Sequence, residues 1–159
     1  MDGNKYNNLS KEEYQSVIKN APLVAVDLII RNRRNEILLG LRKEEPAKGF
    51  WFVPGGRIHK GETIQKAFSD IAEHKLNINL NFSDTALLGV HEHFYDTNPY
   101  GLDNCSTHFL SIVYEININF LRLDHLPDDQ HDAWRWFSFT DLMDSDDVHE
   151  NTKKFVSSS

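Results

Sequence analysis

A short apolar run that ends in two glycines, followed closely by a one-sided apolar helix, is the strongest constraint on the fold. The run and its turn read "GFWFVPGG" over residues 49–56. Adjacent glycines let the backbone approach a ligand closely or adopt conformations that other residues resist. Between residues 62 and 76, apolar side chains recur with the period of a helix, at Ile64, Ala67, Phe68, Ile71, Ala72 and Leu76. We therefore predict a strand, a turn open to a ligand, and a helix that covers a sheet.

The remaining apolar runs predict an α/β chain in one domain. A short first helix is expected within the segment 9–22, with Ser10 as N-cap, Glu13 completing a capping box and Pro22 following its end. A last helix begins with Thr140 as its cap. Strand-like runs occupy residues 23–30, 36–42, 85–96, 107–120 and 131–139, and the polar stretch 31–35 predicts a hairpin. This order predicts a mixed α/β sandwich over residues 1–159, with a frayed tail at 157–159.

Charge and composition exclude several classes of protein. With 17 basic and 24 acidic residues the net charge is −7, which argues against nonspecific nucleic-acid binding. A small phosphate ligand held by two or three arginines stays possible. The single cysteine, Cys105, precludes an internal disulfide. No apolar run is long enough to cross a membrane and the N-terminus is polar, so we expect a cytoplasmic protein without a membrane partner.

A few polar residues stand where chemistry or binding would need them. Arg42 follows a strand and Arg57 follows the two glycines, so both could present forked donors to phosphate oxygens. Asp27 interrupts an apolar strand, and a buried acid needs a partner or a role. His131, in an acidic loop, is either a general base or a solvated surface histidine. Tyr14 either stacks on a purine or packs its helix against the core.

The segment "GRIHKGE" resembles the opening of the Nudix box, a glycine followed after five residues by a glutamate. Four further segments, "GFWFVPGGR", "HEHFYD", "LPDDQHDAWRW" and "SDDVHENT", resemble in order the GDP-mannose mannosyl hydrolase branch of that family. The similarity runs from Leu9 to Phe155. It implies a single Nudix domain over 1–159, folded as an α/β/α sandwich with a mixed β-sheet, and a homodimer in which residues 1–21 cover the neighbouring subunit's site.

The resemblance also implies a reaction and a set of site residues. The reaction is hydrolysis of GDP-mannose, or secondarily GDP-glucose, by water attack at the anomeric carbon, which gives GDP and the free hexose. His131 would be the general base, with Arg42 and Arg57 on the diphosphate, Asp27 near the sugar, and His93 as a further catalytic position. Leu9 and Tyr14 would pack on guanine, whereas Phe109 replaces an expected tyrosine. Gly55 and Gln130 would bind Mg²⁺.

Lys75 departs from the family pattern, because it stands where the resemblance expects the charged metal ligand. Mg²⁺ would therefore be held weakly. Three interpretations follow: Mg²⁺ binds through the substrate with Lys75 turned away, Lys75 replaces part of the metal charge, or the site is inactive. The alternatives to the hydrolase are a noncatalytic GDP-sugar-binding protein and a Nudix pyrophosphatase that gives GMP and sugar phosphate.

Overall fold

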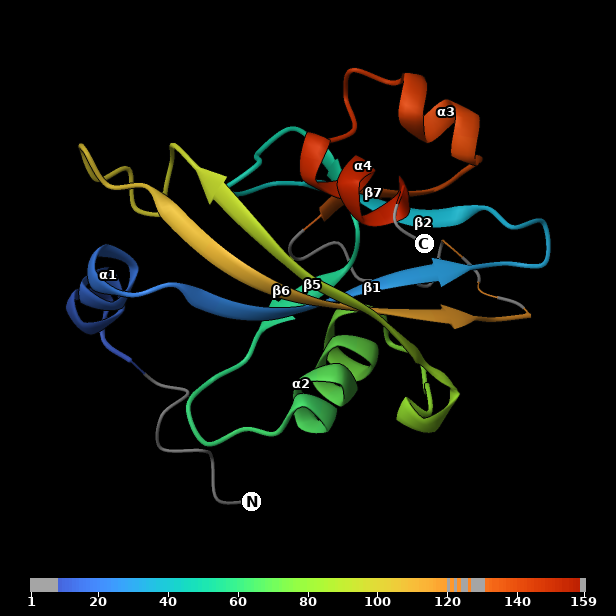
Figure 1. Cartoon of the computed structure of the whole chain (residues 1–159), viewed down its shortest axis with the longest axis horizontal. Coiled ribbons are helices and arrows are strands. Elements are labelled where there is room, and N and C mark those ends of the chain that lie inside the picture. Colours follow the sequence, from blue (N-terminus) through green and yellow to red (C-terminus); the bar gives the residue numbers. More distant parts are fainter. Residues whose placement is uncertain (1–8, 120, 122, 124–125, 127–130, 158–159) are drawn as a thin grey trace.

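The strands and helices alternate along the chain broadly as the sequence predicts (Figure 1). The computed structural model describes residues 9–119, 121, 123, 126 and 131–157, and of residues 131 and 132 only the backbone. The α-helices are α1 Lys11–Asn20, α2 Ile64–Asp70, α3 Phe139–Asp144 and α4 Glu150–Ser157, with a π-helical turn η1 Ile71–Lys75 and a 3₁₀ turn η2 Phe82–Asp84. The strands are β1 Leu23–Arg31, β2 Ile37–Arg42, β3 Trp51–Phe52, β4 Gly55–Arg57, β5 Ala86–Tyr95, β6 Thr107–Asn117 and β7 His131–Phe137.

These strands form one mixed sheet, in the order β3-β2-β1-β6-β5, with β4 paired to β1 and β7 paired to β2. Strand β1 runs parallel to β6 and antiparallel to both β2 and β4. The predicted hairpin is confirmed, since Arg31 pairs with Ile37 across it. In the middle of the sheet, Asp27 lies opposite Gly55 of β4 and Val113 of β6.

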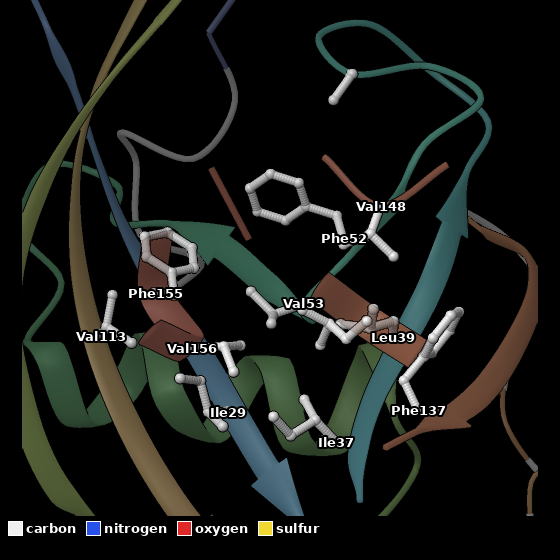
Figure 2. Close-up of a cluster of buried hydrophobic side chains, with 12 residues drawn as sticks. Ile29, Ile37, Leu39, Phe52, Val53, Val113, Phe137, Val148, Phe155 and Val156 are labelled. Carbon is white, nitrogen blue, oxygen red and sulfur yellow. The ribbon is translucent and has the colours of Figure 1, made fainter. Parts of the chain in front are cut away.

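Successive residues of β1 pack into hydrophobic cores on opposite faces of the sheet. Val26, Leu28 and Ile30 pack with Phe68 and Ile71 beneath the helix formed by α2 and η1. On the opposite face, Ile29 packs with Val113 and with Phe155 and Val156 of α4 (Figure 2). Figure 1 shows α2 and α4 on opposite sides of the sheet. The predicted α/β/α sandwich is therefore confirmed, and full burial of a side chain such as Phe155 contributes about 1.5–3 kcal/mol.

The first helix begins as the sequence predicts. The Ser10 hydroxyl accepts from the Glu13 amide at 3.1 Å, and the Glu13 carboxylate accepts from the Ser10 amide at 3.2 Å. Ile18 anchors the helix in a small cluster with Leu23 and Cys105, which is buried. No helix in the described part of the chain is both long and apolar enough to cross a membrane.

The C-terminal helices differ from the prediction. Ser138, not Thr140, caps α3, because β7 already ends at the buried Phe137 and the Ser138 hydroxyl accepts from the Asp141 amide at 3.1 Å. A separate helix, α4, follows and includes Ser157, which was predicted to lie in a frayed tail. Its sequence carries too few apolar residues for a helical period, so its docking depends on Phe155 and Val156 in the core.

The glycine segment also differs from the prediction, since residues 55–57 form strand β4 rather than a turn. Space, not backbone conformation, explains the glycine at position 55. A Cβ added there would lie 2.0 Å from Asp27 Oδ1 and 2.8 Å from the Val26 carbonyl oxygen. Gly55 therefore lets β4 lie directly beside the buried acid of β1.

Candidate functional site

A pocket of about 690 Å³ opens where the glycine strand β4 meets one end of the sheet. Side chains from β1 and β6 line it, together with α1, the segment after β2, and the loop between β5 and β6. Its basic residues are Arg42, Lys43, Lys48, Arg57 and Lys75, and its acidic residues are Asp27, Glu44 and Glu45. Five cations against three acids, in a chain whose net charge is −7, make this pocket locally positive, which suits an anionic ligand.

Arg42 enters the pocket from the end of β2. The register between β2 and β7 shifts between Gly40 and Arg42, and such a bulge re-aims the side chain that follows it. The Arg42 Nε donates to the Pro46 carbonyl oxygen at 2.8 Å, which fixes the guanidinium plane. A guanidinium held in this way is suited to forked hydrogen bonds with phosphate oxygens.

Arg57 and Tyr14 meet at the pocket wall. The Arg57 guanidinium carbon lies 4.2 Å from the centre of the Tyr14 ring, a cation–π contact that positions both groups. Tyr14 also meets Tyr100 edge to face, with 5.8 Å between ring centres. The ring packs its helix against the protein, as one of the two interpretations states, and it also lines the pocket. Stacking on a purine stays a prediction.

Asp27 lies in the pocket and is almost fully buried at 6% exposure. Burial raises the pKa of this carboxyl to about 6, and opposing contributions come from a hydrogen bond with Ser111 and from the positive charges of Lys75 and Arg42. The acid that interrupts the apolar strand thus has both partners and a position facing the ligand space. It titrates near neutral pH, as a group that handles protons would.

Lys75 ends the π-helical turn and extends into the same pocket. Its ammonium group donates to the Gly55 carbonyl oxygen, the predicted metal ligand. Burial and, to a smaller extent, the Arg42 charge lower the pKa of Lys75 to about 8, and the Asp27 charge opposes both. The interpretation in which Lys75 turns away from the site is therefore wrong.

We expect Gly55→Ala to lower the free energy of unfolding by about 1–3 kcal/mol, because its Cβ would overlap Asp27 and the β1 backbone. Gly56→Ala is the matched control. A Cβ at Gly56 meets only side-chain atoms, Ile71 Cγ1 at 3.2 Å and Lys75 Nζ at 3.4 Å, and these can move. Urea unfolding of both variants checks the prediction, and equal losses for the two would contradict it.

The structure does not bring every predicted site residue to the pocket. His93 is 2% exposed and packs on Phe155 at 4.7 Å between ring centres, outside the pocket lined by the described residues. Burial lowers the pKa of His93 to about 4, so its ring is neutral at physiological pH. Leu9 also lies outside this lining. Gln130 is outside the described residues.

His131, the predicted base, is described only through its backbone. Strand β7 begins at this residue, which pairs with Arg42 in the register of β2. The sheet thus places the backbone of the predicted base directly beside that of a predicted phosphate-binding arginine. Its role stays a prediction.

Sequence reasoning missed several pocket residues. Tyr100, Tyr95 and Lys48 all line the pocket, and Phe109 does so as the resemblance suggests. Burial raises the pKa of Tyr95 to about 12, so the phenol stays protonated and can donate a hydrogen bond. The signal available for Tyr100 was an aromatic residue in a loop rich in Asn, Gly and Pro, since loop aromatics are common in binding sites.

Comparison with known proteins agrees with this geometry. Residues 21–158 match the NUDIX domain. The chain is 39% identical over 127 residues to the low-salt glycan biosynthesis protein Agl8 of Haloferax volcanii, spanning 79% of this chain and 77% of that protein. It is 38% identical over 97 residues to the ADP-ribose pyrophosphatase of Methanocaldococcus jannaschii, spanning 61% of this chain and 52% of that protein.

Among solved structures, a MutT NUDIX hydrolase from Burkholderia pseudomallei matches with a TM-score of 0.69 and 26% identity, covering 87% of this chain and 98% of that one. The chain therefore belongs to the Nudix family of hydrolases. Members of this family act on nucleotide-derived substrates and generally use a divalent metal ion such as Mg²⁺.

The described residues do not fit a resident divalent ion. No group of three or more His, Cys, Asp or Glu side chains able to hold a metal occurs among them. In the helix where acids were expected, Asp70 pairs with Lys66, and the Glu62 carboxylate accepts from the His59 amide at 2.8 Å. The Gly55 carbonyl already accepts a hydrogen bond from an ammonium group. Mg²⁺ prefers several oxygen ligands, and a neighbouring positive charge repels it.

Proposed function

We propose that this Nudix protein hydrolyses a nucleoside diphosphate sugar, with GDP-mannose as the first candidate substrate and GDP-glucose as the second. The observation that carries the proposal is the concentration of Arg42, Arg57 and Lys75 in one pocket beside the ring of Tyr14. Cationic side chains suit a diphosphate, and an aromatic face suits a purine. The relation to a glycan biosynthesis protein supports a sugar-containing substrate.

In the proposed reaction, water attacks the anomeric carbon of the sugar. His131 takes one proton from the water as its oxygen forms the new bond to carbon. The bond between that carbon and the diphosphate oxygen breaks, and its electron pair leaves with GDP. Arg42 and Arg57 would stabilise the negative charge on the departing diphosphate, with Asp27 close to the sugar. The products are GDP and a free hexose of inverted configuration.

The reduced acidic box favours attack at carbon over attack at phosphorus. Asp70, Ile71, His74 and Lys75 occupy the positions where the family pattern places the metal-binding box. Asp70 is engaged by Lys66 and lies 3.9 Å from His74. A pyrophosphatase that relies on several metal-bound oxygens would lack those ligands here.

Mg²⁺ would be held weakly in this proposal, because Lys75 stands at the position of the expected acidic ligand and contacts the Gly55 carbonyl oxygen. The proposed reaction is compatible with either cation, a weakly held Mg²⁺ or the Lys75 ammonium group. The homodimer also stays a proposal. Within one chain, α1 already places Tyr14 at the pocket, so a partner's N-terminal segment would add to this wall.

We expect GDP-mannose incubated in ¹⁸O-water to give GDP and mannose, with the label in the sugar. Label in a phosphate, together with GMP and mannose 1-phosphate, would instead support the pyrophosphatase that the relation to an ADP-ribose pyrophosphatase suggests. Mass spectrometry of the products separates the two. Tight binding without turnover of GDP-mannose or GDP-glucose would support the noncatalytic binding protein and contradict the proposed hydrolysis.

A further inference from the structure

The path of the Lys75 side chain is unusual for a lysine near the end of a helix. Regular α-helix ends at Asp70, and Ile71–Lys75 form a π-helical turn. A π turn inserts one extra residue, which rotates the residues after it by about 100° relative to a continuous α-helix. Such turns occur often at functional sites. Here the turn ends on Lys75, whose side chain then reaches the pocket.

The end of the Lys75 side chain lies close to both glycines of β4. A Cβ at Gly56 would lie 3.4 Å from Lys75 Nζ, so the ammonium group passes close over the β4 backbone. From there it donates to the Gly55 carbonyl oxygen. The two glycines therefore differ: Gly55 leaves space that Asp27 occupies, whereas a Cβ at Gly56 would come closest to Ile71 and would only touch the end of the Lys75 side chain.

The Lys75 ammonium group is under opposing influences in the pocket. Asp27 favours its charged form, whereas burial and the Arg42 charge oppose that form and lower the pKa of Lys75 to about 8, so the group still carries its charge at pH 7. Arg42 enters from β2 and Arg57 from β4, so three cations from three parts of the chain line one pocket. A diphosphate group presents several anionic oxygens that can accept from all three.

The same carbonyl oxygen cannot serve both a divalent ion and the ammonium group without bringing two positive charges together. We propose that the Lys75 ammonium group is the resident cation of this pocket and binds the diphosphate in place of a divalent metal ion. This inference takes the identity of the ligand, a nucleoside diphosphate, from the proposed function. It depends on that function in no other respect. The consequence is a Nudix site whose affinity for nucleoside diphosphates does not require metal.

Calorimetric titration with GDP tests this without depending on turnover. The wild-type protein should bind GDP with the same affinity in EDTA and in Mg²⁺, within about twofold. Lys75→Gln, which removes the charge, should weaken GDP binding by about 10- to 100-fold in both buffers. Lys66→Gln changes an exposed lysine of the preceding helical turns and should bind as the wild type does. Circular dichroism and thermal unfolding confirm that each variant is folded.

Lys75→Glu provides the converse test, because it restores the acid that the family pattern expects. This variant should bind GDP poorly in EDTA and recover in Mg²⁺. It should also bind Mn²⁺, as seen by electron paramagnetic resonance, where the wild type does not. Loss of wild-type GDP binding in EDTA with recovery in Mg²⁺, or unchanged binding by Lys75→Gln, would overturn the proposal.

Inorganic diphosphate is the second probe. It separates the inference that Lys75 binds diphosphate from the proposal that the ligand is a nucleotide. Metal-independent binding of diphosphate that depends on Lys75, without binding of GDP, would leave this inference standing and contradict the nucleotide part of the proposed function. Failure of both probes to bind in either buffer would overturn the inference. Absence of sugar hydrolysis with normal binding would contradict only the proposed reaction.

Discussion

Replacing Arg42 with glutamine is expected to lower kcat/KM for GDP-mannose by about 10²- to 10³-fold, since preorganised donors on a developing negative charge contribute about that much to catalysis. The Arg42 Nε is fixed by the Pro46 carbonyl oxygen at 2.8 Å, so the guanidinium meets the diphosphate without reorganisation. Glutamine keeps a polar side chain but removes the positive charge and the paired N–H donors of the guanidinium group. If the arginine acts mainly on the departing GDP, most of the loss should appear in kcat.

Two further variants define what Arg42 contributes. Arg42→Lys keeps the charge but not the forked donors, and we expect a smaller loss than for glutamine. Arg135→Gln is the matched control, because Arg135 is an exposed arginine that lies over Phe137 at 4.3 Å and outside the pocket lining. Steady-state kinetics on Arg42→Gln, Arg42→Lys and Arg135→Gln test whether Arg42 acts on the diphosphate. An Arg42→Gln enzyme as active as Arg135→Gln would exclude Arg42 from the diphosphate site.

The prediction from sequence succeeded where local pattern and tertiary structure agree. The capping box of Ser10 and Glu13 and the apolar run of β1 specify their elements through short-range chemistry, and the structure confirms both. The one-sided helix that starts at Ile64 also lies where its apolar period indicates. Motif matching then brought Arg42, Arg57, Asp27 and Tyr14 to one site, and all four line the pocket.

The features that sequence reasoning missed depend on contacts between distant segments. Helix α4 has a mostly polar sequence, and the packing of Phe155 and Val156 in the core against the sheet explains its place. Tyr100 reaches the pocket because its loop folds back onto α1, where it meets Tyr14. The direction of Lys75 was open among three interpretations because a π-helical turn, which leaves no mark in the apolar period, determines it.

The buried Asp27 should give the protein a distinctive loss of stability between mildly acidic and neutral pH. Burial raises the pKa of this carboxyl from 3.8 to about 6 in the folded state. As pH rises, the unfolded chain releases this proton first, so the folded state loses its relative advantage across that interval. The stability linked to the group is fully present below about 3.8 and is lost as pH rises through about 6. The difference corresponds to roughly 3 kcal/mol.

Asp27→Asn removes this titration, so the stability difference between variant and wild type should shift in favour of the variant by up to roughly 3 kcal/mol between pH 4 and 7. Because the Asp27 charge raises the pKa of Lys75, the variant lowers that pKa below about 8, and titration of Lys75 near pH 7 shifts the stability difference in the same direction. Ser111→Ala removes a hydrogen bond that lowers the Asp27 pKa, so it should extend the loss to higher pH. Urea unfolding at several pH values measures each curve. Parallel curves for wild type and Asp27→Asn would mean that the carboxyl is as well solvated as in the unfolded chain, and the pocket would then offer no proton-handling group at this position.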